Sequence, residues 1–157
     1  MRIVGVSGSL RTGSSNTALV EAAVGLAPPG VGVDVLTGIA DLPAFNPDHD
    51  TDPPPGPVAA LRARLAAADA VIVSSPEYAH GVPGALKNAL DWLVSSGELY
   101  GTPVGVVDTT AGGHAHRSLL ETLRVMGAVP VEGAVVAVPR LRTRVDAGGR
   151  LDDAEAA

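Results

Sequence analysis

The sequence predicts a doubly wound, parallel α/β sheet. Five short apolar runs stand out, and four of them are rich in β-branched residues with little alternation, as is typical of strands covered on both faces. Segments with helical spacing lie between these runs, so the order along the chain is β-α-β-α-β-α-β-α-β, which implies parallel strands joined by helical crossovers. The five runs are residues 3–6, 31–36, 70–74, 104–107 and 134–138. The second run partly alternates, so we expect it at an edge of the sheet.

Four helices are predicted from apolar residues spaced three and four positions apart, because this spacing places them on one helical face. Residues 15–17 are polar and can cap the first helix, and Pro57 suits the first position of the second. Lys87 and Asp91 are spaced as an ion pair on the third helix. The apolar positions are Leu19, Ala22, Ala23 and Leu26, then Val58, Leu61, Leu65 and Ala68, then Leu86, Ala89, Leu90 and Leu93, and finally Leu119, Leu120, Leu123 and Met126.

Composition excludes several classes of protein. A net charge of −6 argues against nucleic-acid binding, and the absence of cysteine excludes a disulfide framework, a thiol nucleophile and a Cys-ligated metal site. The sequence shows neither a signal peptide nor an 18-residue apolar run. We therefore expect a single cytoplasmic domain over residues 1–157, with no membrane partner and no metal. Residues 41–56 are expected to form a long exposed loop, and residues 139–157 a polar tail with the final helix short or missing.

A loop rich in glycine and hydroxyl groups, GSLRTGSSN, follows the first apolar run from Gly8 to Asn16. It matches a nucleoside-triphosphate loop except that Ser14 occupies the position of the required lysine. It matches neither the dinucleotide-binding glycine pattern nor the nucleophile elbow. The N–H groups at a helix start, together with Arg11, favour a single phosphate group. On spacing alone, an ordinary strand-to-helix turn with good capping residues remains the alternative.

The loop after the third run reads SPEYAHGVPGALKNALDW, from Ser75 to Trp92. This stretch resembles the P-E-Y-x-x-x-x-P-G-x-L-K-N-x-(L/I)-D-W signature of the NADPH-dependent FMN reductase family, and GSLRTGSSN resembles the phosphate loop of that family, G-S-x-R-x-x-S-x-N. The two motifs stand in the right order, and the resemblance covers about residues 1–138. It implies a flavodoxin-like, three-layer α/β/α fold whose five strands have the order 2-1-3-4-5.

The resemblance implies that the first loop holds the phosphate of FMN and that two later loops line the isoalloxazine ring. No side chain is expected to act as a nucleophile or as an acid–base catalyst. The residues implied for the phosphate are Ser9, Arg11, Ser15, Asn16 and Thr17. The residues implied for the ring are Pro76, Glu77, Tyr78 and Ala79 from the second loop, and Thr109, Thr110 and Gly112 from the third.

By the same resemblance, the activity would be a ping-pong oxidoreduction. NADPH or NADH would pass a hydride to bound FMN and leave, and an oxidant would then use the same face of the flavin. The oxidant would be a quinone, a free flavin, an azo compound or a metal oxyanion. A one-electron flavodoxin-like carrier is an alternative, although its phosphate loop usually lacks the arginine, and a non-catalytic flavin-binding module is another.

Several motif residues also have structural interpretations. Tyr78 can pack on a neighbouring subunit, Glu77 can form an ion pair, and Trp92 is typical of a core or an interface. Members of the family generally continue into another helix after the fifth strand, whereas this sequence turns polar there. An uncovered strand at residues 134–138 would be an association surface, so we expect a homodimer or a homotetramer.

Overall fold

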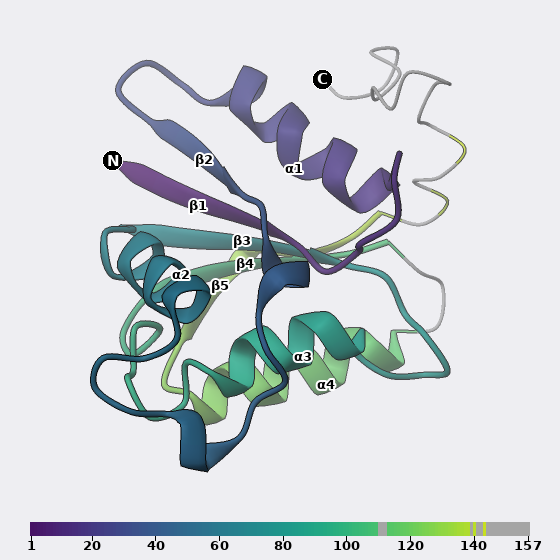
Figure 1. Ribbon diagram of the computed structural model, residues 1–157. Helices are drawn as coiled ribbons and strands as arrows, with labels where there is room; N and C mark the ends of the chain where they lie inside the picture. The colour runs from purple at the N-terminus through teal and green to yellow at the C-terminus, as the bar shows by residue number, and fades with distance from the viewer. Residues whose placement is uncertain (110–112, 139, 141–142, 144–157) are drawn as a thin grey trace.

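The computed structural model describes residues 1–109, 113–138, 140 and 143. It shows one five-stranded parallel sheet with the order β2-β1-β3-β4-β5 (Figure 1). The strands are β1 (Arg2–Ser7), β2 (Gly32–Leu36), β3 (Ala70–Ser75), β4 (Pro103–Asp108) and β5 (Val129–Ala137). This arrangement confirms the predicted fold class and strand order, with the partly alternating strand at an edge.

Helices cover both faces of the sheet, which gives three layers (Figure 1). α1 (Ser15–Leu26) lies on one face, and α2 (Gly56–Ala66), α3 (Gly84–Asp91) and α4 (His114–Val125) lie on the other. Two short 3-10 helices, η1 (Ile39–Asp41) and η2 (Pro47–His49), follow β2. Within the described residues, no helix has the length and apolar character needed to cross a bilayer. Most of the expected polar tail, including any final helix, lies outside the described residues.

α1 differs from its predicted apolar stripe. Leu26 is 68% exposed, whereas Ala18 and Val20 are buried. A Cβ atom placed on Gly5 of β1 would lie only 2.4 Å from Cγ1 of Val20. The missing side chain at Gly5 therefore lets α1 approach β1 closely, and this contact decides which helical face is buried. The cap also differs, because Ser14 precedes the helix and its Oγ accepts a hydrogen bond from the backbone N–H of Asn16.

β5 is longer than predicted, because it begins at Val129 rather than at residue 134. Its register against β4 shifts between Val104 and Val106, which is a β-bulge. A Cβ atom on Gly105 would lie 3.2 Å from Cβ of Ala134, so the glycine permits close approach at the bulge. Pro130 interrupts the apolar run, and this interruption hid the first half of the strand from the sequence pattern.

The expectation that the segment after β2 is an exposed loop is wrong for its first part. Leu42 is buried, and Phe45 packs against the core. The carbonyl oxygen of Pro43 accepts hydrogen bonds from Nδ2 of Asn88 at 3.0 Å and from Nε1 of Trp92 at 2.8 Å. Asn88 of α3 and Trp92, the C-cap of α3, thus hold residues 42–45 against the body of the protein. Trp92 is fully buried, which confirms its interpretation as a core residue.

Asp34 attaches the edge strand β2 to its neighbours. Arg64 of α2 donates from Nη2 to Oδ1 at 2.6 Å and from Nε to Oδ2 at 3.2 Å, and Arg2 of β1 donates to Oδ2 at 3.0 Å. The hydrogen bonds from Arg64 have the largest effect on the pKa of Asp34, and the hydrogen bond from Arg2 has the next largest. Together they hold this pKa below its usual range.

We expect Asp34→Asn to destabilise the protein at pH 7, and the effect to shrink as the pH falls to 3. The pKa of Asp34 is lower in the folded state than in the unfolded state. The ion pairs therefore stabilise the fold above the unfolded pKa of about 3.9, and this stabilisation is lost as the pH falls through the folded pKa. Because the pair is partly exposed, the loss at pH 7 should be about 1 kcal/mol or less. Urea unfolding of both proteins at the two pH values measures it, and an effect that does not depend on pH would contradict the assignment.

Candidate functional site at the carboxyl edge of the sheet

Three loops meet at the carboxyl edge of the sheet, on the right in Figure 1. Loop 1 (residues 8–14) follows β1, loop 2 (residues 76–82) follows β3, and loop 3 (residues 109–113) follows β4. Because β3 lies between β1 and β4 in the sheet, loop 2 starts about 5 Å from loop 1 on one side and about 5 Å from loop 3 on the other. Doubly wound sheets bind their ligands at this edge.

Loop 1 presents the start of α1 together with a cation. α1, which is described throughout, has no acidic residue in its first turn, so no carboxylate there offsets the positive end of the helix dipole. Arg11 is exposed, and its Nη2 donates to the carbonyl oxygen of Gly13 at 2.8 Å, which holds the guanidinium beside the loop. A helix start and a guanidinium on the same loop suit an anion such as a phosphate.

Asn16 joins loop 1 to the two neighbouring strand ends. It is buried, and its Oδ1 accepts hydrogen bonds from Oγ of Ser74 at 2.9 Å and from Oγ1 of Thr109 at 3.0 Å. The backbone N–H of Gly8 donates to the carbonyl oxygen of Ser74 at 2.8 Å. A side chain on Gly8 would clash, since its Cβ would lie 2.9 Å from Oγ of Ser75. The three loops therefore start from one hydrogen-bonded centre with tight packing.

Loop 2 contains a tight turn whose two central residues are strained. The backbone N–H groups of Tyr78 and Gly81 each donate to the carbonyl oxygen of the other, at 3.1 and 2.9 Å. Ala79 and His80 between them have φ angles of +49° and +61°. Turns with this backbone conformation normally contain Asn or Gly. Any other residue in the left-handed region destabilises the folded state by about 1 kcal/mol. Strain of this kind is typical of ligand-binding segments. Tyr78, at the start of this turn, is 55% exposed.

Loop 2 is joined to the start of α4, directly after loop 3, by two contacts. Oε2 of Glu77 accepts a hydrogen bond from the backbone N–H of Ala115 at 2.9 Å, in the first turn of α4. The N-cap of α4 is Gly113, which has no side chain for this purpose, so Glu77 satisfies the helix start from another loop. The ring of His80 stacks on that of His114, with 4.2 Å between the ring centroids and 12° between the planes. These contacts hold loop 2 against the first turn of α4.

The site residues predicted from the resemblance differ in exposure. Ser9, Ser15 and Asn16 are buried, Thr17, Pro76, Glu77 and Thr109 are half-buried, and Arg11, Tyr78 and Ala79 are exposed. Thr110 and Gly112 lie outside the described residues. Three of the hydroxyl groups already bond within the protein: Oγ of Ser9 accepts from the backbone N–H of Arg11, Oγ1 of Thr17 donates to Oγ of Ser7, and Oγ1 of Thr109 donates to Oδ1 of Asn16. A ligand at this edge would thus meet the exposed residues first.

The sequence reasoning missed two serines that organise the site. Oγ of Ser7 accepts from Thr17 at 2.9 Å and from the backbone N–H of Ser9 at 3.3 Å, and Ser74 is completely buried beneath Asn16. The available signal was a serine at the carboxyl end of the first and third apolar runs. In a sequence, a serine at the end of a strand cannot be distinguished from an ordinary strand residue, because its hydrogen-bond partners are not known.

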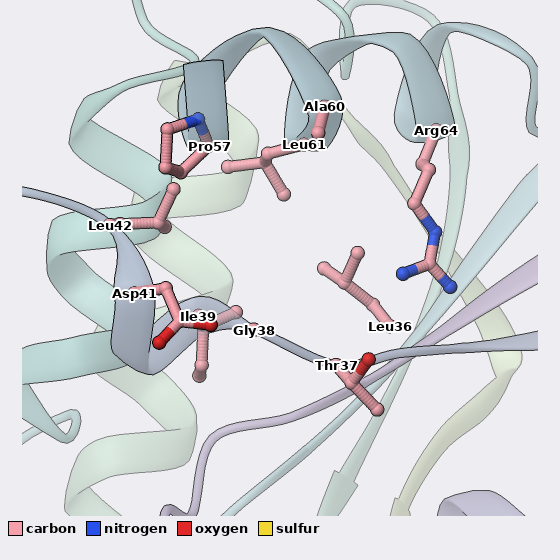
Figure 2. Close-up of a pocket in the computed structure, with 10 residues that line it drawn as sticks. All are labelled: Leu36, Thr37, Gly38, Ile39, Asp41, Leu42, Pro57, Ala60, Leu61 and Arg64. Carbon is pink, nitrogen blue, oxygen red and sulfur yellow. The ribbon is translucent and has the colours of Figure 1, made fainter. Parts of the chain in front are cut away.

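A separate pocket of about 360 Å³ lies at the carboxyl end of β2, between η1 and α2 (Figure 2). Leu36 and Leu61 contribute to its apolar wall, with Arg64 and Asp41 on opposite sides. Arg64 is already engaged by Asp34 and by the carbonyl oxygen of Val35. The pocket shares no residue with the predicted flavin site, and it is distinct from the three loops.

A parallel sheet of order 2-1-3-4-5, with a phosphate-type loop after β1 and two further loops beside it, defines a flavodoxin-like flavoprotein. The model of the family "NADPH-dependent FMN reductase" matches residues 1–142, and the chain belongs to this family. It is accordingly an oxidoreductase that uses FMN as its cofactor and NAD(P)H as its electron donor.

Individual relatives agree with this assignment. An NAD(P)H-dependent FMN reductase of Pseudomonas aeruginosa is 35% identical over 162 residues, which cover 99% of this chain and 87% of that protein. A quinone reductase of Escherichia coli is 36% identical over 115 residues, covering 71% of this chain and 61% of the other. The structure of a flavoenzyme NAD(P)H:(acceptor) oxidoreductase from Paracoccus denitrificans superimposes with a TM-score of 0.82 at 30% identity, covering 97% of this chain and 86% of that one.

The residues present fit FMN. The start of α1, free of acidic residues in its first turn, and the guanidinium of Arg11 suit a single phosphate group. Tyr78 is exposed on loop 2, and Thr109 of loop 3 lies within hydrogen-bond reach of the end of β3. Loops 2 and 3 would thus supply an aromatic group and a hydroxyl group to a flavin bound at this edge.

Proposed function

We propose that the chain transfers a hydride from NAD(P)H, through FMN held by the three loops, to a small-molecule acceptor by ping-pong chemistry. The observation that carries the proposal is the junction of loops 1, 2 and 3, which offers a phosphate site and an exposed Tyr78 at one edge. When bound, FMN supplies the hydride chemistry itself. A quinone is the acceptor that we favour, because the Escherichia coli relative is a quinone reductase.

In this proposal, the chain binds and orients the cofactor rather than moving protons. Ser9, Arg11, Ser15, Asn16 and Thr17 would surround the phosphate, Arg11 with its guanidinium and the others with hydroxyl, amide and backbone groups. Pro76, Glu77, Tyr78 and Ala79 would line one side of the ring, and Thr109, Thr110 and Gly112 the other. Glu77 would act indirectly, because its carboxylate holds loop 2 against α4.

The test is the flavin spectrum of the purified protein. We expect a yellow holoprotein that NADPH or NADH bleaches without oxygen and that a quinone then reoxidises, with parallel lines in double-reciprocal plots of initial rates. A protein that stays colourless with added FMN would contradict the proposal. A flavin that exchanges single electrons with a partner protein but is not reduced by NAD(P)H would instead indicate a flavodoxin-like carrier.

Arg11→Ala should weaken FMN binding by roughly 10- to 100-fold, because one charge-assisted hydrogen bond to a phosphate is lost. Arg11 is exposed and pairs with no carboxylate among the described residues, so the fold should be unaffected. Quenching of flavin fluorescence on titrating the apoprotein measures the dissociation constant. Arg124→Ala, at the last turn of α4, is the matched control and should bind FMN like the wild type. Equal affinity in the two variants would place the phosphate elsewhere.

We also propose a homodimer or a homotetramer. A groove of about 550 Å³ between α3 and α4 includes the exposed side chains of Val94, Tyr100 and Val125. β5 adds a second exposed apolar region at its valines. Contiguous apolar surface of this kind marks association sites. Light scattering at micromolar concentration should show a mass at least twice that of one chain, and a monomer would contradict the proposal.

A further inference from the structure

We propose that Arg117 binds a phosphate group of the reduced pyridine dinucleotide, the electron donor. The inference rests on the proposed function, and it assigns a residue to which neither sequence motif points.

Arg117 lies close to the contact between loop 2 and the start of α4. It follows loop 3 in the first turn of α4, and its Nη2 is 3.2 Å from Nδ1 of His114. Its Nη1 is 3.3 Å from the position that a Cβ atom on Gly113 would occupy. His114 in turn stacks on His80 of loop 2. The guanidinium therefore belongs to the site itself rather than to a remote face of α4.

The contact with His114 leaves most of the guanidinium available. A guanidinium only donates hydrogen bonds, so Nδ1 of His114 is the acceptor in this contact. Arg117 is exposed, and among the described residues its side chain makes this single hydrogen bond. Four of its five N–H donors therefore have no partner within the described ranges and can donate to a ligand.

Arg117 forms no ion pair with a carboxylate of the described residues, although Oδ2 of Asp108 lies 3.8 Å from the same Cβ position on Gly113. Arg2 and Arg64 pair with Asp34, Arg62 pairs with Asp50 and Glu98, and Lys87 pairs with Asp91. The nearby Glu77 is bonded to the backbone of α4 instead.

Two arginines without carboxylate partners thus flank the three-loop site. Arg11 lies on loop 1 and Arg117 just beyond loop 3, and the strands that lead to them are two strand spacings apart, or about 10 Å. FMN carries one phosphate group, which the proposed function places at Arg11. The second cation is therefore left for the other phosphate-bearing substrate, and a guanidinium fork is suited to phosphate oxygens.

The experiment uses the holoprotein and separates the two half-reactions. Anaerobic stopped-flow bleaching of the flavin by NADPH and by NADH gives the dissociation constant of each donor, and reoxidation by an uncharged quinone is followed separately. In Arg117→Gln, we expect the dissociation constant for NADPH to rise by roughly 10- to 100-fold, which corresponds to the loss of one charged hydrogen bond. The dissociation constant of Arg117→Lys for NADPH should lie between those of the wild type and Arg117→Gln. Arg124→Gln, on the same helix, should have the dissociation constant of the wild type. Retained FMN and an unchanged rate of reoxidation show that the variant is folded.

The two donors distinguish the phosphate groups. A loss confined to NADPH, with weaker competition by adenosine 2′,5′-bisphosphate, assigns Arg117 to the 2′-phosphate. Equal losses for NADPH and NADH, with weaker competition by ADP, assign it to the pyrophosphate. Unchanged constants for both donors, or an effect on reoxidation alone, would overturn the inference while the proposed function stands. A wild-type flavin that neither donor bleaches would overturn the proposed function, and this inference with it.

Discussion

Trp92→Ala should lower the free energy of unfolding by about 3–5 kcal/mol, since it removes a fully buried aromatic side chain. The indole ring packs edge-on against Phe45, with 5.1 Å between centroids, and its Nε1 donates to the carbonyl oxygen of Pro43. The substitution would therefore leave a cavity in the core and remove one of the hydrogen bonds that hold residues 42–45, while those made by Asn88 remain. Urea unfolding at neutral pH measures the change.

Two control variants separate the contributions of Trp92. Trp92→Phe retains most of the ring but loses the hydrogen bond to Pro43, so its loss should be smaller, on the order of 1–3 kcal/mol. Leu26→Ala, at an exposed position at the end of α1, should change the stability by less than about 0.5 kcal/mol. A loss below about 1 kcal/mol in Trp92→Ala would mean that residues 42–45 are held in another way.

Asn16→Asp should weaken FMN binding on the order of 100-fold or more, because it places a carboxylate beside the proposed phosphate position, where like charges repel strongly in a partly buried site. The hydroxyl groups of Ser74 and Thr109 would keep an oxygen acceptor, so the connections among the three loops would survive. Titration of the apoprotein with FMN, with circular dichroism as a check on folding, measures the effect.

Asn16→Ala is the matched comparison for Asn16→Asp. It removes the acceptor shared by the two hydroxyl groups without adding a charge, so it should cost about 1–3 kcal/mol of stability. Its effect on FMN affinity should be smaller than that of Asn16→Asp. If the two variants bind FMN equally well, the phosphate does not lie near Asn16.

Local patterns sufficed for the elements of the sheet. Residues 3–6 and 70–74 are continuous apolar runs, and buried parallel strands are the structures that tolerate such runs. The same reasoning failed where a distant residue decided the outcome. Gly5 determines which face of α1 is buried, and Trp92 holds a segment that the sequence marks only as rich in proline and aspartate. Neither contact leaves a periodic signal.

The sequence by itself determined the order of strands and helices, the three loops and the family resemblance, because these depend on neighbouring residues. Only the tertiary structure decided how the loops connect. Asn16 meets Ser74 and Thr109, which are 58 and 93 positions away, and Glu77 meets Ala115, which is 38 positions away. These pairs form because the strand order places the ends of β1, β3 and β4 side by side. Arg117 reaches the same edge in this way, although no motif includes it.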